Sequence, residues 1–272
     1  MKAPNIIVFD SGLGGLTVYR EVAAALPQAR YLYVADDAFF PYGGRDESAL
    51  IARVVDLMGD LIAPEKPDLV VIACNTASTL VLPQLRERFQ VPFIGTVPAI
   101  KPACAASISK RVSVLGTLAT VAREYTKALI RDFANGADVT LVGSGALAAL
   151  AEAKLRGESV DDAAIARELS PCFVDADGRR TDTVVLACTH YPLLLDRFTA
   201  LAPWPVRFID PAPAIARRAV ELMGAPPGGP PAGAPARIRF TSGRLSSPAL
   251  SAALAGFGLR ESAPNGGCQA AV

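Results

Sequence analysis

The chain has 272 residues, enough for one large domain or two of modest size. Hydrophobic residues make up 51% of the chain and charged residues 19%, a composition that supports buried cores and excludes disorder. The 27 Lys and Arg balance the 26 Asp and Glu, so there is no basic excess for nucleic acid or a membrane surface. No apolar run approaches the roughly 18–20 residues of a membrane span, and residues 6–9 are too short for a signal-peptide core. We therefore expect a cytoplasmic protein that binds neither nucleic acid nor membranes.

Short apolar runs rich in β-branched residues alternate with segments that have a helical pattern. The expected strands cover residues 5–9, 31–35, 68–73, 92–94, 111–115, 139–142, 183–187, 206–209 and 237–242. The expected helices cover residues 16–25, 47–62, 79–89, 123–133, 165–169 and 214–222. This alternation predicts an α/β fold with parallel sheets buried on both faces. A Pro/Gly-rich loop is expected over 224–236, and a frayed tail over the last 12 residues or so.

One stretch of sequence occurs twice. The segment 68–76, DLVVIACNT, aligns with 182–190, DTVVLACTH, at an offset of 114 residues. A weaker match pairs residues 6–11 with 112–117. A generic buried strand would explain the shared apolar residues, but not the shared cysteine followed by two polar residues. The repeat therefore predicts two related α/β lobes built on one plan.

The chain that follows the second copy is too short for a third domain, so we expect it to return to the first lobe. The first lobe is then expected to cover residues 1–97 plus 208–272, and the second to cover 98–207.

The rare residues limit the chemistry. The single histidine, His190, excludes metal motifs that need two histidines. The five cysteines, at positions 74, 104, 172, 188 and 268, include no C-x-x-C pair. Neither a structural zinc site nor a full set of disulfides is therefore expected, and the cysteines are interpreted as free thiols.

Polar residues follow the predicted strands, where ligands bind in a parallel sheet. They are Asp10, Ser11 and Gly12; Asp36 and Asp37; Cys74, Asn75 and Thr76; Thr117; and Cys188, Thr189 and His190. Because the carboxyl ends of parallel strands share one edge of a sheet, these residues could bind one small charged ligand.

Two interpretations compete for the glycine-rich loop 10–15, DSGLGG, which opens a helix. A dinucleotide-binding loop would use Asp36 as the ribose-binding acid, but Thr17 stands where G-x-G-x-x-G requires its last glycine. A turn that fits the helix against the sheet explains the glycines, but not the acid and hydroxyl that begin the loop. Residues 39–45, FFPYGGR, taken alone favour an ordinary surface turn.

Cys74 and Cys188 differ from the other cysteines because each stands where a strand ends and polar groups begin. A thiol has an unperturbed pKa of about 8.5, so either protonation state can be reached near neutral pH. Two facing thiols, one in each lobe, could act on opposite sides of one carbon, one removing a proton and the other delivering one. Such a pair inverts a stereocentre without a cofactor. Cys104, Cys172 and Cys268 are interpreted as small apolar side chains.

Several motifs occur together in an order and spacing that belong to a known family. They are VFDSGLGGLTV at 8–18, Asp36 with PYG at 41–43, ACNTAS at 73–78, VLGTLAT at 114–120, LACTHYPLL at 186–194 and IDPA at 209–212. On these motifs the chain resembles the cofactor-independent aspartate/glutamate racemase family, and within it the glutamate racemases.

The resemblance implies two pseudo-symmetric α/β lobes with mostly parallel sheets and an active site in the cleft between them. It also implies interconversion of L- and D-glutamate without a cofactor or metal, supplying D-glutamate for peptidoglycan. A homodimer is expected.

The resemblance also assigns roles to residues. It implies that Cys74 takes the α-proton of D-glutamate and that Cys188 takes the α-proton of L-glutamate. The implied substrate-binding residues are Asp10 and Ser11, Tyr42 and Gly43, Asn75 and Thr76, and Thr189 and His190. Asp10 and His190 resemble groups that assist the neighbouring thiols, and the further assisting candidates are Asp36, Glu152, Thr117 and Thr120. One departure concerns Glu152, because Ser144 and Gly145 replace the Cys-Pro pair that precedes its helix in the family.

Three other interpretations remain open. The first is a cysteine-dependent hydrolase with Cys188 as nucleophile and His190 as base, although two residues separated by one position after a strand do not obviously meet. The second is a related racemase or isomerase acting on aspartate, hydantoins or maleate. The third is a two-lobed amino-acid sensor without catalytic activity.

Overall fold

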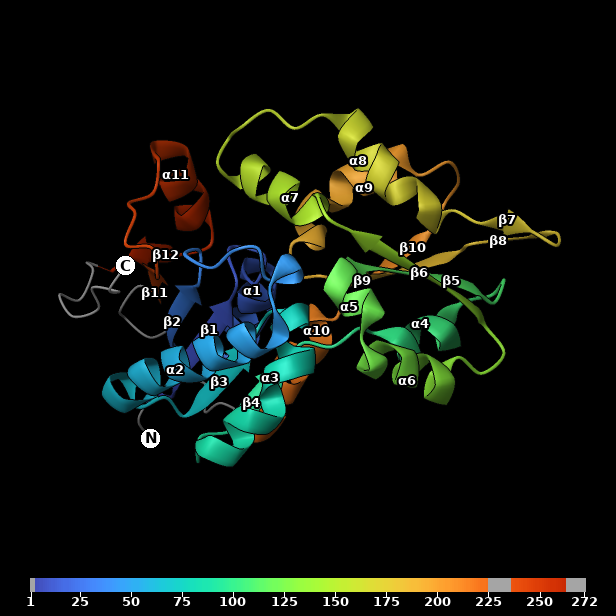
Figure 1. Ribbon diagram of the computed structural model, residues 1–272. Coiled ribbons are helices and arrows are strands. Elements are labelled where there is room, and N and C mark those ends of the chain that lie inside the picture. The colour runs from blue at the N-terminus through green and yellow to red at the C-terminus, as the bar shows by residue number, and fades with distance from the viewer. Residues whose placement is uncertain (1–2, 225–235, 263–272) are drawn as a thin grey trace.

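The computed structural model describes residues 3–224 and 236–262, which form two parallel β-sheets with helices packed on both faces of each (Figure 1). Most of the predicted Pro/Gly-rich loop, and the tail with Cys268, lie outside the described residues. In the part of the chain that is described, no helix combines the length and apolar character needed to cross a bilayer.

The first sheet has six strands in the order β12-β11-β2-β1-β3-β4, and every neighbouring pair is parallel. The strands are β1 (Asn5–Asp10), β2 (Arg30–Ala35), β3 (Leu69–Ile72), β4 (Phe93–Gly95), β11 (Ala236–Phe240) and β12 (Leu259–Glu261). The central strands are continuous apolar runs because both of their faces are covered, and every residue of β3 is buried.

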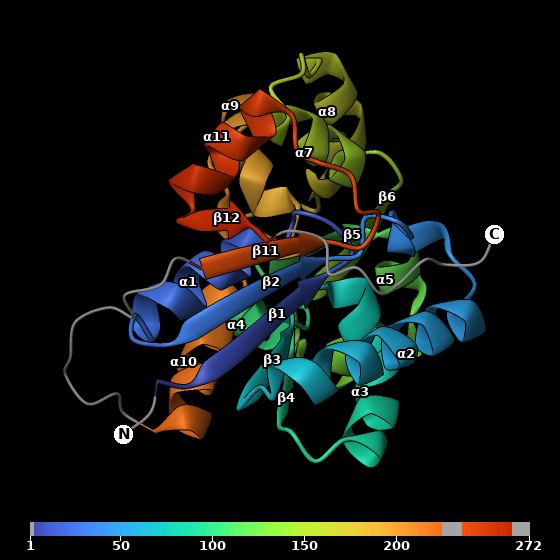
Figure 2. The same cartoon turned by 90° about the vertical axis from the view of Figure 1, so that its left-hand side faces the viewer.

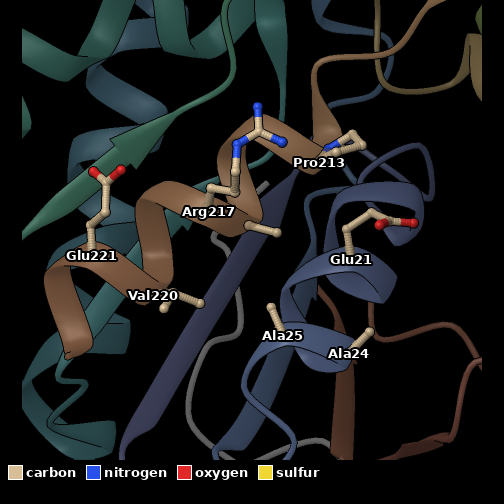
Figure 3. Close-up of a pocket in the computed structure, with 8 residues that line it drawn as sticks. Glu21, Ala24, Ala25, Pro213, Arg217, Val220 and Glu221 are labelled. Atoms are coloured by element: carbon tan, nitrogen blue, oxygen red, sulfur yellow. The ribbon is translucent and has the colours of Figure 1, made fainter. Parts of the chain in front are cut away.

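Helices cover both faces of this sheet (Figure 2). One face packs against α1 (Leu16–Ala25), α10 (Ala212–Met223) and α11 (Pro248–Gly256). The other packs against α2 (Glu47–Glu65) and α3 (Asn75–Arg88). The helices α1 and α10 lie side by side, and Figure 3 shows the pocket between them, where Ala24, Ala25 and Val220 face its interior.

The second sheet has four parallel strands in the order β10-β9-β5-β6. They are β5 (Arg111–Thr117), β6 (Asp138–Ser144), β9 (Thr183–Ala187) and β10 (Arg207–Ile209). One face packs against α7 (Leu147–Leu155), α8 (Asp162–Leu169) and α9 (Leu195–Leu201), and the other against α4 (Ile100–Ala106) and α6 (Glu124–Phe133). The remaining elements are α5 (Leu118–Ala122), the hairpin strands β7 (Asp175–Ala176) and β8 (Arg179–Arg180), and the 3₁₀ turns η1 (Tyr42–Gly44), η2 (Ser170–Cys172) and η3 (Tyr191–Leu194).

The two sheets repeat one strand order. The order β2-β1-β3-β4 in the first sheet corresponds to β6-β5-β9-β10 in the second. Cys74 follows β3 and Cys188 follows β9, which hold the same place in this order. The duplicated α/β plan predicted from the sequence repeat is thereby confirmed, and so is the dominance of parallel pairing.

The chain returns to the first sheet at its C-terminal end, because β11 pairs with β2 and β12 pairs with β11. The expected point of return, residue 208, falls inside β10, which pairs with β9 in the second sheet. The division of the chain into domains at the stated residues stays a prediction.

The third helix begins four residues earlier than predicted. The structure starts α3 at Asn75, with Cys74 at the N-cap in extended backbone, whereas the sequence pattern suggested residue 79. Asn and Thr favour caps over helix interiors, so the pattern placed the start too late. As a result the residues after Cys74 occupy the first helical turn, where backbone N–H groups are free to face a ligand.

Candidate active site

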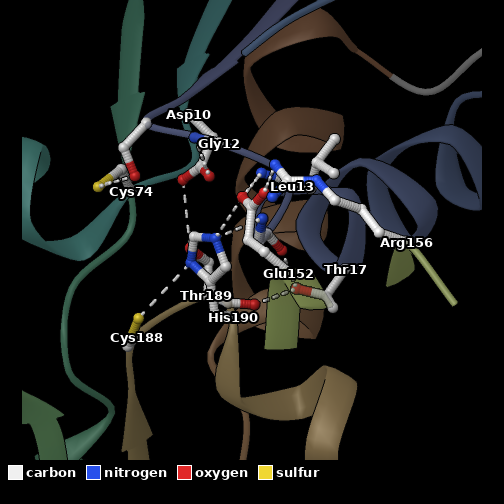
Figure 4. A network of polar contacts seen from close by, with 12 residues as sticks. Asp10, Gly12, Leu13, Thr17, Cys74, Glu152, Arg156, Cys188, Thr189 and His190 are labelled. Carbon is white, nitrogen blue, oxygen red and sulfur yellow. Dashed lines mark hydrogen bonds and ion pairs between the residues drawn. The ribbon is translucent and has the colours of Figure 1, made fainter. Parts of the chain in front are cut away.

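Cys74 and Cys188 lie at the carboxyl ends of β3 and β9, where the two sheets approach each other. Cys74 and Cys188 are buried, at 5% and 6% exposed, and Figure 4 shows both sulfur atoms on the same side of one polar network. The charge of Cys188 contributes to the pKa of Cys74, so the two thiols lie within electrostatic range of each other. Two buried thiols this near each other could act on one small ligand.

Cys74 has an acidic environment. Its thiol donates to Ser11 Oγ over 3.7 Å. Burial raises the pKa of the Cys74 thiol and the negative charge of Asp10 raises it further, while the Ala77 amide in the first turn of α3 lowers it in part. The balance keeps Cys74 protonated at neutral pH, in the state of a proton donor.

Cys188 instead has a histidine beside it. Its sulfur lies 3.8 Å from His190 Nδ1, so the two side chains do meet despite their separation by one residue. The other ring nitrogen, Nε2, lies 3.1 Å from Glu152 Oε1. Burial lowers the pKa of His190, but the contacts with Cys188 and Glu152 outweigh it and hold the pKa well above its usual value.

The position of the ring proton follows from the neighbours of Nε2. The Gly14 amide, at 3.2 Å, can donate to Nε2 only when that nitrogen carries no proton, whereas a hydrogen bond to Glu152 requires one. The carboxylate is the stronger partner because a charge-assisted hydrogen bond is worth more than a neutral one. With the proton on Nε2, the lone pair of Nδ1 faces Cys188, and the imidazole can take the thiol proton.

Glu152 is held by both halves of the chain. Its Oε1 accepts from the Leu13 amide at 2.7 Å, and its Oε2 forms an ion pair with Arg156 Nη2 at 2.7 Å. Burial raises the pKa of Glu152, but His190, the Leu13 amide and Arg156 together bring it below its usual value. Glu152 is therefore a carboxylate. The change to Ser144 does not disturb its helix, because Ser144 Oγ accepts from the Leu147 amide at the start of α7.

The glycines of the 10–15 loop admit these side chains from the other sheet. A Cβ on Gly12 would lie 2.2 Å from Glu152 Oε1, and a Cβ on Gly14 would lie 2.3 Å from His190 Nδ1. Protein side chains occupy the space at the loop that a dinucleotide phosphate would need. The interpretation of the loop as a turn that permits close packing is thus supported. What packs against its glycines, however, is the pair of side chains Glu152 and His190 from the other sheet.

Asp10 and Thr189 join the halves at a second point. Thr189 Oγ1 donates to Asp10 Oδ1 at 3.2 Å, and the Gly12 amide donates to Asp10 Oδ2 at 3.0 Å. Thr17 Oγ1 donates to the Thr189 carbonyl at 3.3 Å. Burial raises the pKa of Asp10 above its usual value, although the His190 charge and the Gly12 amide lower it in part.

Asp36 anchors the loop that carries Tyr42 and Gly43. Its carboxylate accepts from Tyr42 Oη at 2.7 Å, from Arg53 Nη2 at 2.7 Å and from Thr241 Oγ1 at 2.6 Å. Tyr42 is only 2% exposed, so the interpretation of this loop as an ordinary surface turn is wrong. Its sequence looks like a turn, but the ring is buried because η1 packs against α5 and α3.

Three hydroxyls meet across the two halves beside Asn75. Thr76 Oγ1 lies 3.0 Å from Thr117 Oγ1 and 3.2 Å from Thr120 Oγ1. The Asn75 side chain is buried, and neither its amide nitrogen nor its carbonyl oxygen has a hydrogen-bond partner among the described residues. A buried amide without partners is costly, which makes Asn75 a candidate to bind a polar ligand.

Four residues of this network, Arg156, Thr17, Phe40 and Arg53, were not among the predicted site residues. Arg156 could have been found as the i,i+4 partner of Glu152, and Thr17 as part of the glycine-loop motif. Phe40, whose ring centre lies 5.5 Å from that of His190, and Arg53 carry no local signal. Within the described residues, no three His, Cys, Asp or Glu side chains are grouped so that they could hold a metal ion.

Comparison with known proteins shows the family to which the chain belongs. Residues 9–219 match the Asp/Glu/Hydantoin racemase family, and the chain belongs to that family. Among its members, glutamate racemase of Brucella canis is 52% identical over 256 residues, 94% of this chain and 92% of the relative. Glutamate racemase of Brucella anthropi is 58% identical over 219 residues, 80% of this chain and 79% of the relative. The crystal structure of Escherichia coli glutamate racemase with L-glutamate and the activator UDP-MurNAc-Ala superposes with a TM-score of 0.87 at 38% identity, covering 96% of this chain and 99% of that one.

Proposed function

We propose that the protein is a glutamate racemase that moves the α-proton between two thiols on opposite faces of the substrate. The observation that carries this proposal is the pair Cys74 and Cys188 at equivalent strand ends of two duplicated sheets, both facing one network. The glutamate racemases among its relatives support glutamate as the substrate.

The neighbours of each thiol indicate which thiol removes the α-proton and which one delivers a proton. With L-glutamate, Cys188 passes its proton to His190 and, as a thiolate, removes the α-proton. Cys74, held as a thiol, then delivers its proton to the opposite face of the carbanion and yields D-glutamate. The reverse reaction begins from the Cys74 thiolate and a protonated Cys188.

The carbanion needs stabilisation because the α-proton of an amino acid is only weakly acidic. Hydrogen-bond donors fixed before the reaction can supply it, since they need no reorganisation as charge develops. We assign this role to Ser11, Asn75, Thr76 and Thr189, with Tyr42 and Gly43 completing the binding site. Asp10 is placed to hold the substrate ammonium, Asp36 to position Tyr42, and Thr117 and Thr120 to position Thr76.

Proton NMR of L-glutamate in D₂O with the purified protein, without any added cofactor, tests the proposal. The Cα–H signal should disappear while D-glutamate accumulates. Cys74→Ala and Cys188→Ala should each lower kcat/KM by about 10²–10⁴-fold or more. Cys104→Ala, in the core between α4 and the second sheet, is the matched control and should retain most of the activity. Normal turnover by Cys188→Ala would remove the second base.

The contact between Cys188 and His190 also favours a second candidate, a cysteine hydrolase. This function gives Cys74 no role. A covalent acyl-enzyme trapped at Cys188, without exchange of the α-hydrogen, would select it over the racemase. Activity on aspartate or a hydantoin, with none on glutamate, would instead select a different substrate within the family.

We further propose that the enzyme works in the cytoplasm as a homodimer and supplies D-glutamate for peptidoglycan. The glutamate racemases among its relatives support the supply of D-glutamate. Growth of a D-glutamate-requiring bacterium on expression of the chain tests the supply. Light scattering of the purified protein tests the dimer, which a monomeric mass would contradict.

A further inference from the structure

The strand β11 ends beside the loop that follows β2, residues 36–45, which we call the β2 loop. The two strands are parallel neighbours, so both end at the same edge of the sheet (Figure 2). After β11, residues 240–243 form a tight turn, closed by a hydrogen bond of 3.3 Å from its last amide to its first carbonyl. Gly243 has a φ of 68°, which glycine adopts without strain. The turn places Thr241 and Ser242 against the β2 loop.

The Thr241 hydroxyl makes two hydrogen bonds to the β2 loop. It donates to Asp36 Oδ1 at 2.6 Å and accepts from the Ala38 amide at 3.3 Å. The backbone fixes this hydroxyl in turn, because the Thr241 amide donates to the Ala35 carbonyl at 3.0 Å and so continues the pairing of β11 with β2. Thr241 is therefore bonded to the sheet and to the loop at the same time.

Ser242 makes a second attachment one residue further on. Its amide donates to Asp37 Oδ1 at 2.9 Å, and its hydroxyl donates to Asp37 Oδ2. The partners in the pairs Thr241–Asp36 and Ser242–Asp37 are 205 residues apart in the chain. The start of the β2 loop is thus held by the C-terminal part of the chain.

Asp36 connects this attachment to Tyr42. The Asp36 side chain is fully buried, and its Oδ2 accepts from Tyr42 Oη at 2.7 Å while its Oδ1 accepts from Thr241. Arg53 donates to both oxygens, at 3.2 Å and 2.7 Å. Each donor restricts how the carboxylate can turn, so the loss of one donor changes the geometry that the others meet. A shift of the carboxylate would move the Tyr42 hydroxyl with it.

The β2 loop also contacts the second half of the chain. The Phe40 ring centre lies 5.5 Å from that of His190, and a Cβ on Gly43 would lie 3.1 Å from Thr117 Cβ. Among the described residues, Thr241 forms hydrogen bonds with the start of the β2 loop and the end of β2, and with neither thiol. Its hydroxyl can therefore affect the candidate active site only through the β2 loop.

We propose that Thr241 and Ser242 are positioning residues for substrate binding, which hold the β2 loop where Tyr42 and Gly43 meet glutamate. This inference rests on the proposed function, in which Tyr42 and Gly43 belong to the binding site. The return of the chain to the first sheet then serves binding as well as completing the sheet. Because Thr241 bonds to neither thiol, loss of its hydroxyl should weaken the binding of glutamate and leave proton transfer largely intact.

Thr241→Val tests the proposal because it keeps the branched shape of the side chain and removes the hydroxyl. Steady-state racemisation, followed by circular dichroism, should show KM raised about tenfold by the loss of a hydrogen bond to a buried carboxylate, with little change in kcat. The rise should be equal for L- and D-glutamate, because the equilibrium mixture is racemic. Thr241→Ser restores the hydroxyl and should restore KM. Ser242→Ala should raise KM in the same direction, and it decides the question if Thr241→Val does not fold.

Ser262→Ala is the matched control. It removes a hydrogen bond of 3.0 Å from Ser262 Oγ to the Ile238 carbonyl, on the side of β11 that faces β12. It therefore loosens β11 without touching the β2 loop, and its KM and kcat should match those of the unsubstituted enzyme. A general loss of stability would raise KM in this variant too.

Hydrogen exchange of the peptide that covers the β2 loop measures the attachment without turnover. Thr241→Val should exchange faster there because the Ala38 amide loses its acceptor, whereas Ser262→Ala should not. An unchanged KM in Thr241→Val, a fall in kcat alone, no recovery in Thr241→Ser, or an equal rise in KM in Ser262→Ala overturns the proposal. A protein that does not racemise glutamate contradicts the proposed function instead. Hydrogen exchange then decides whether Thr241 holds the loop, and equal exchange in all variants overturns that role.

Discussion

The two thiols are chemically unequal although they occupy equivalent strand ends. Cys74 lies beside a carboxylate and a hydroxyl, and burial together with the Asp10 charge raises its pKa. Cys188 lies beside an imidazole that Glu152 orients. In the proposed function, these unequal neighbours are the reason why Cys188 acts as the base and Cys74 as the acid toward L-glutamate.

Glu152→Gln should slow the enzyme because it removes the charge that supports the His190 imidazolium while keeping the size of the side chain. We expect kcat/KM to fall about 10–100-fold. The fall must be equal in both directions, because enantiomers have equal free energies and the equilibrium mixture is racemic.

The asymmetry of Glu152→Gln should appear in kinetic isotope effects. If proton removal by Cys188 becomes rate-limiting, the α-deuterium effect should be larger for L-glutamate than for D-glutamate. Glu158→Gln, at an exposed position near the same helix, is the control and should match the unsubstituted enzyme. Equal isotope effects in Glu152→Gln would show that Glu152 does not act through Cys188.

Asp10→Asn should stabilise the fold while lowering activity. The pKa of Asp10 is raised in the folded protein by burial, so the folded state binds this proton more tightly than the unfolded chain does. The stability gained from the neutral acid is present at low pH and is lost as the pH rises through the folded pKa. The advantage of Asn should therefore grow as the pH rises from about 4 through the folded pKa of Asp10, as measured by urea denaturation. Asp60→Asn, exposed on α2, is the control. A gain that does not depend on pH would contradict this account.

At the scale of elements, the glycine-rich loop 10–15 is where the first sheet contacts side chains of the second. It follows β1, its amides reach Glu152 and His190, and its missing Cβ atoms leave room for both. Short parallel strands that end in small or polar residues allow this approach. A loop with side chains at positions 12 and 14 would hold the second sheet away from the first.

Gly14→Ala tests the close contact between this loop and His190. The added Cβ would lie 2.3 Å from His190 Nδ1 and 2.6 Å from the His190 backbone nitrogen, so the loop or His190 must move. We expect a loss of roughly 1–3 kcal/mol in the free energy of unfolding and a fall in kcat of at least about 100-fold. Gly59→Ala is the matched control, since a Cβ there meets nothing within 4 Å and α2 should gain up to about 1 kcal/mol. Normal activity in Gly14→Ala would show that the close approach is dispensable.

Strands and lobes were predictable from local pattern, whereas the partners of several site residues were not. The apolar runs before Asp10, Cys74 and Cys188 predicted the strand ends, because a doubly buried parallel strand is apolar throughout. The helix α4 gave no clear signal, since its seven residues include a proline. The ion pair between Arg53 and Asp36 depends on how α2 packs on the sheet, and no sequence spacing encodes that packing.

At the scale of the whole molecule, the candidate site is enclosed by the two halves of the chain. Asp10, His190 and both thiols are at most 6% exposed, and hydrogen bonds from the glycine loop cross from one half to the other. Glutamate can reach the thiols only if the halves separate, and closure around it then excludes water.

Hydrogen exchange measures this opening. The amides of Leu13 and Gly14 are bonded to side chains of the other half, so they should exchange whenever the halves part. Saturating glutamate should slow exchange in the peptide that contains them by severalfold. The β7–β8 hairpin is far from the site and provides the internal control. Unchanged exchange at the loop would argue against opening as the route of entry.

Because β3 and β9 are counterparts in a doubled chain, the protein has two copies of one strand-end cysteine in a single polypeptide. In an assembly of two identical chains, any change beside one sulfur would appear beside the other. Here Ser11 accompanies one copy and His190 the other, so the surroundings of one sulfur can change without the same change beside the other. Duplication within one gene thus gives an enzyme for mirror-image substrates the freedom to evolve unequal affinities for them.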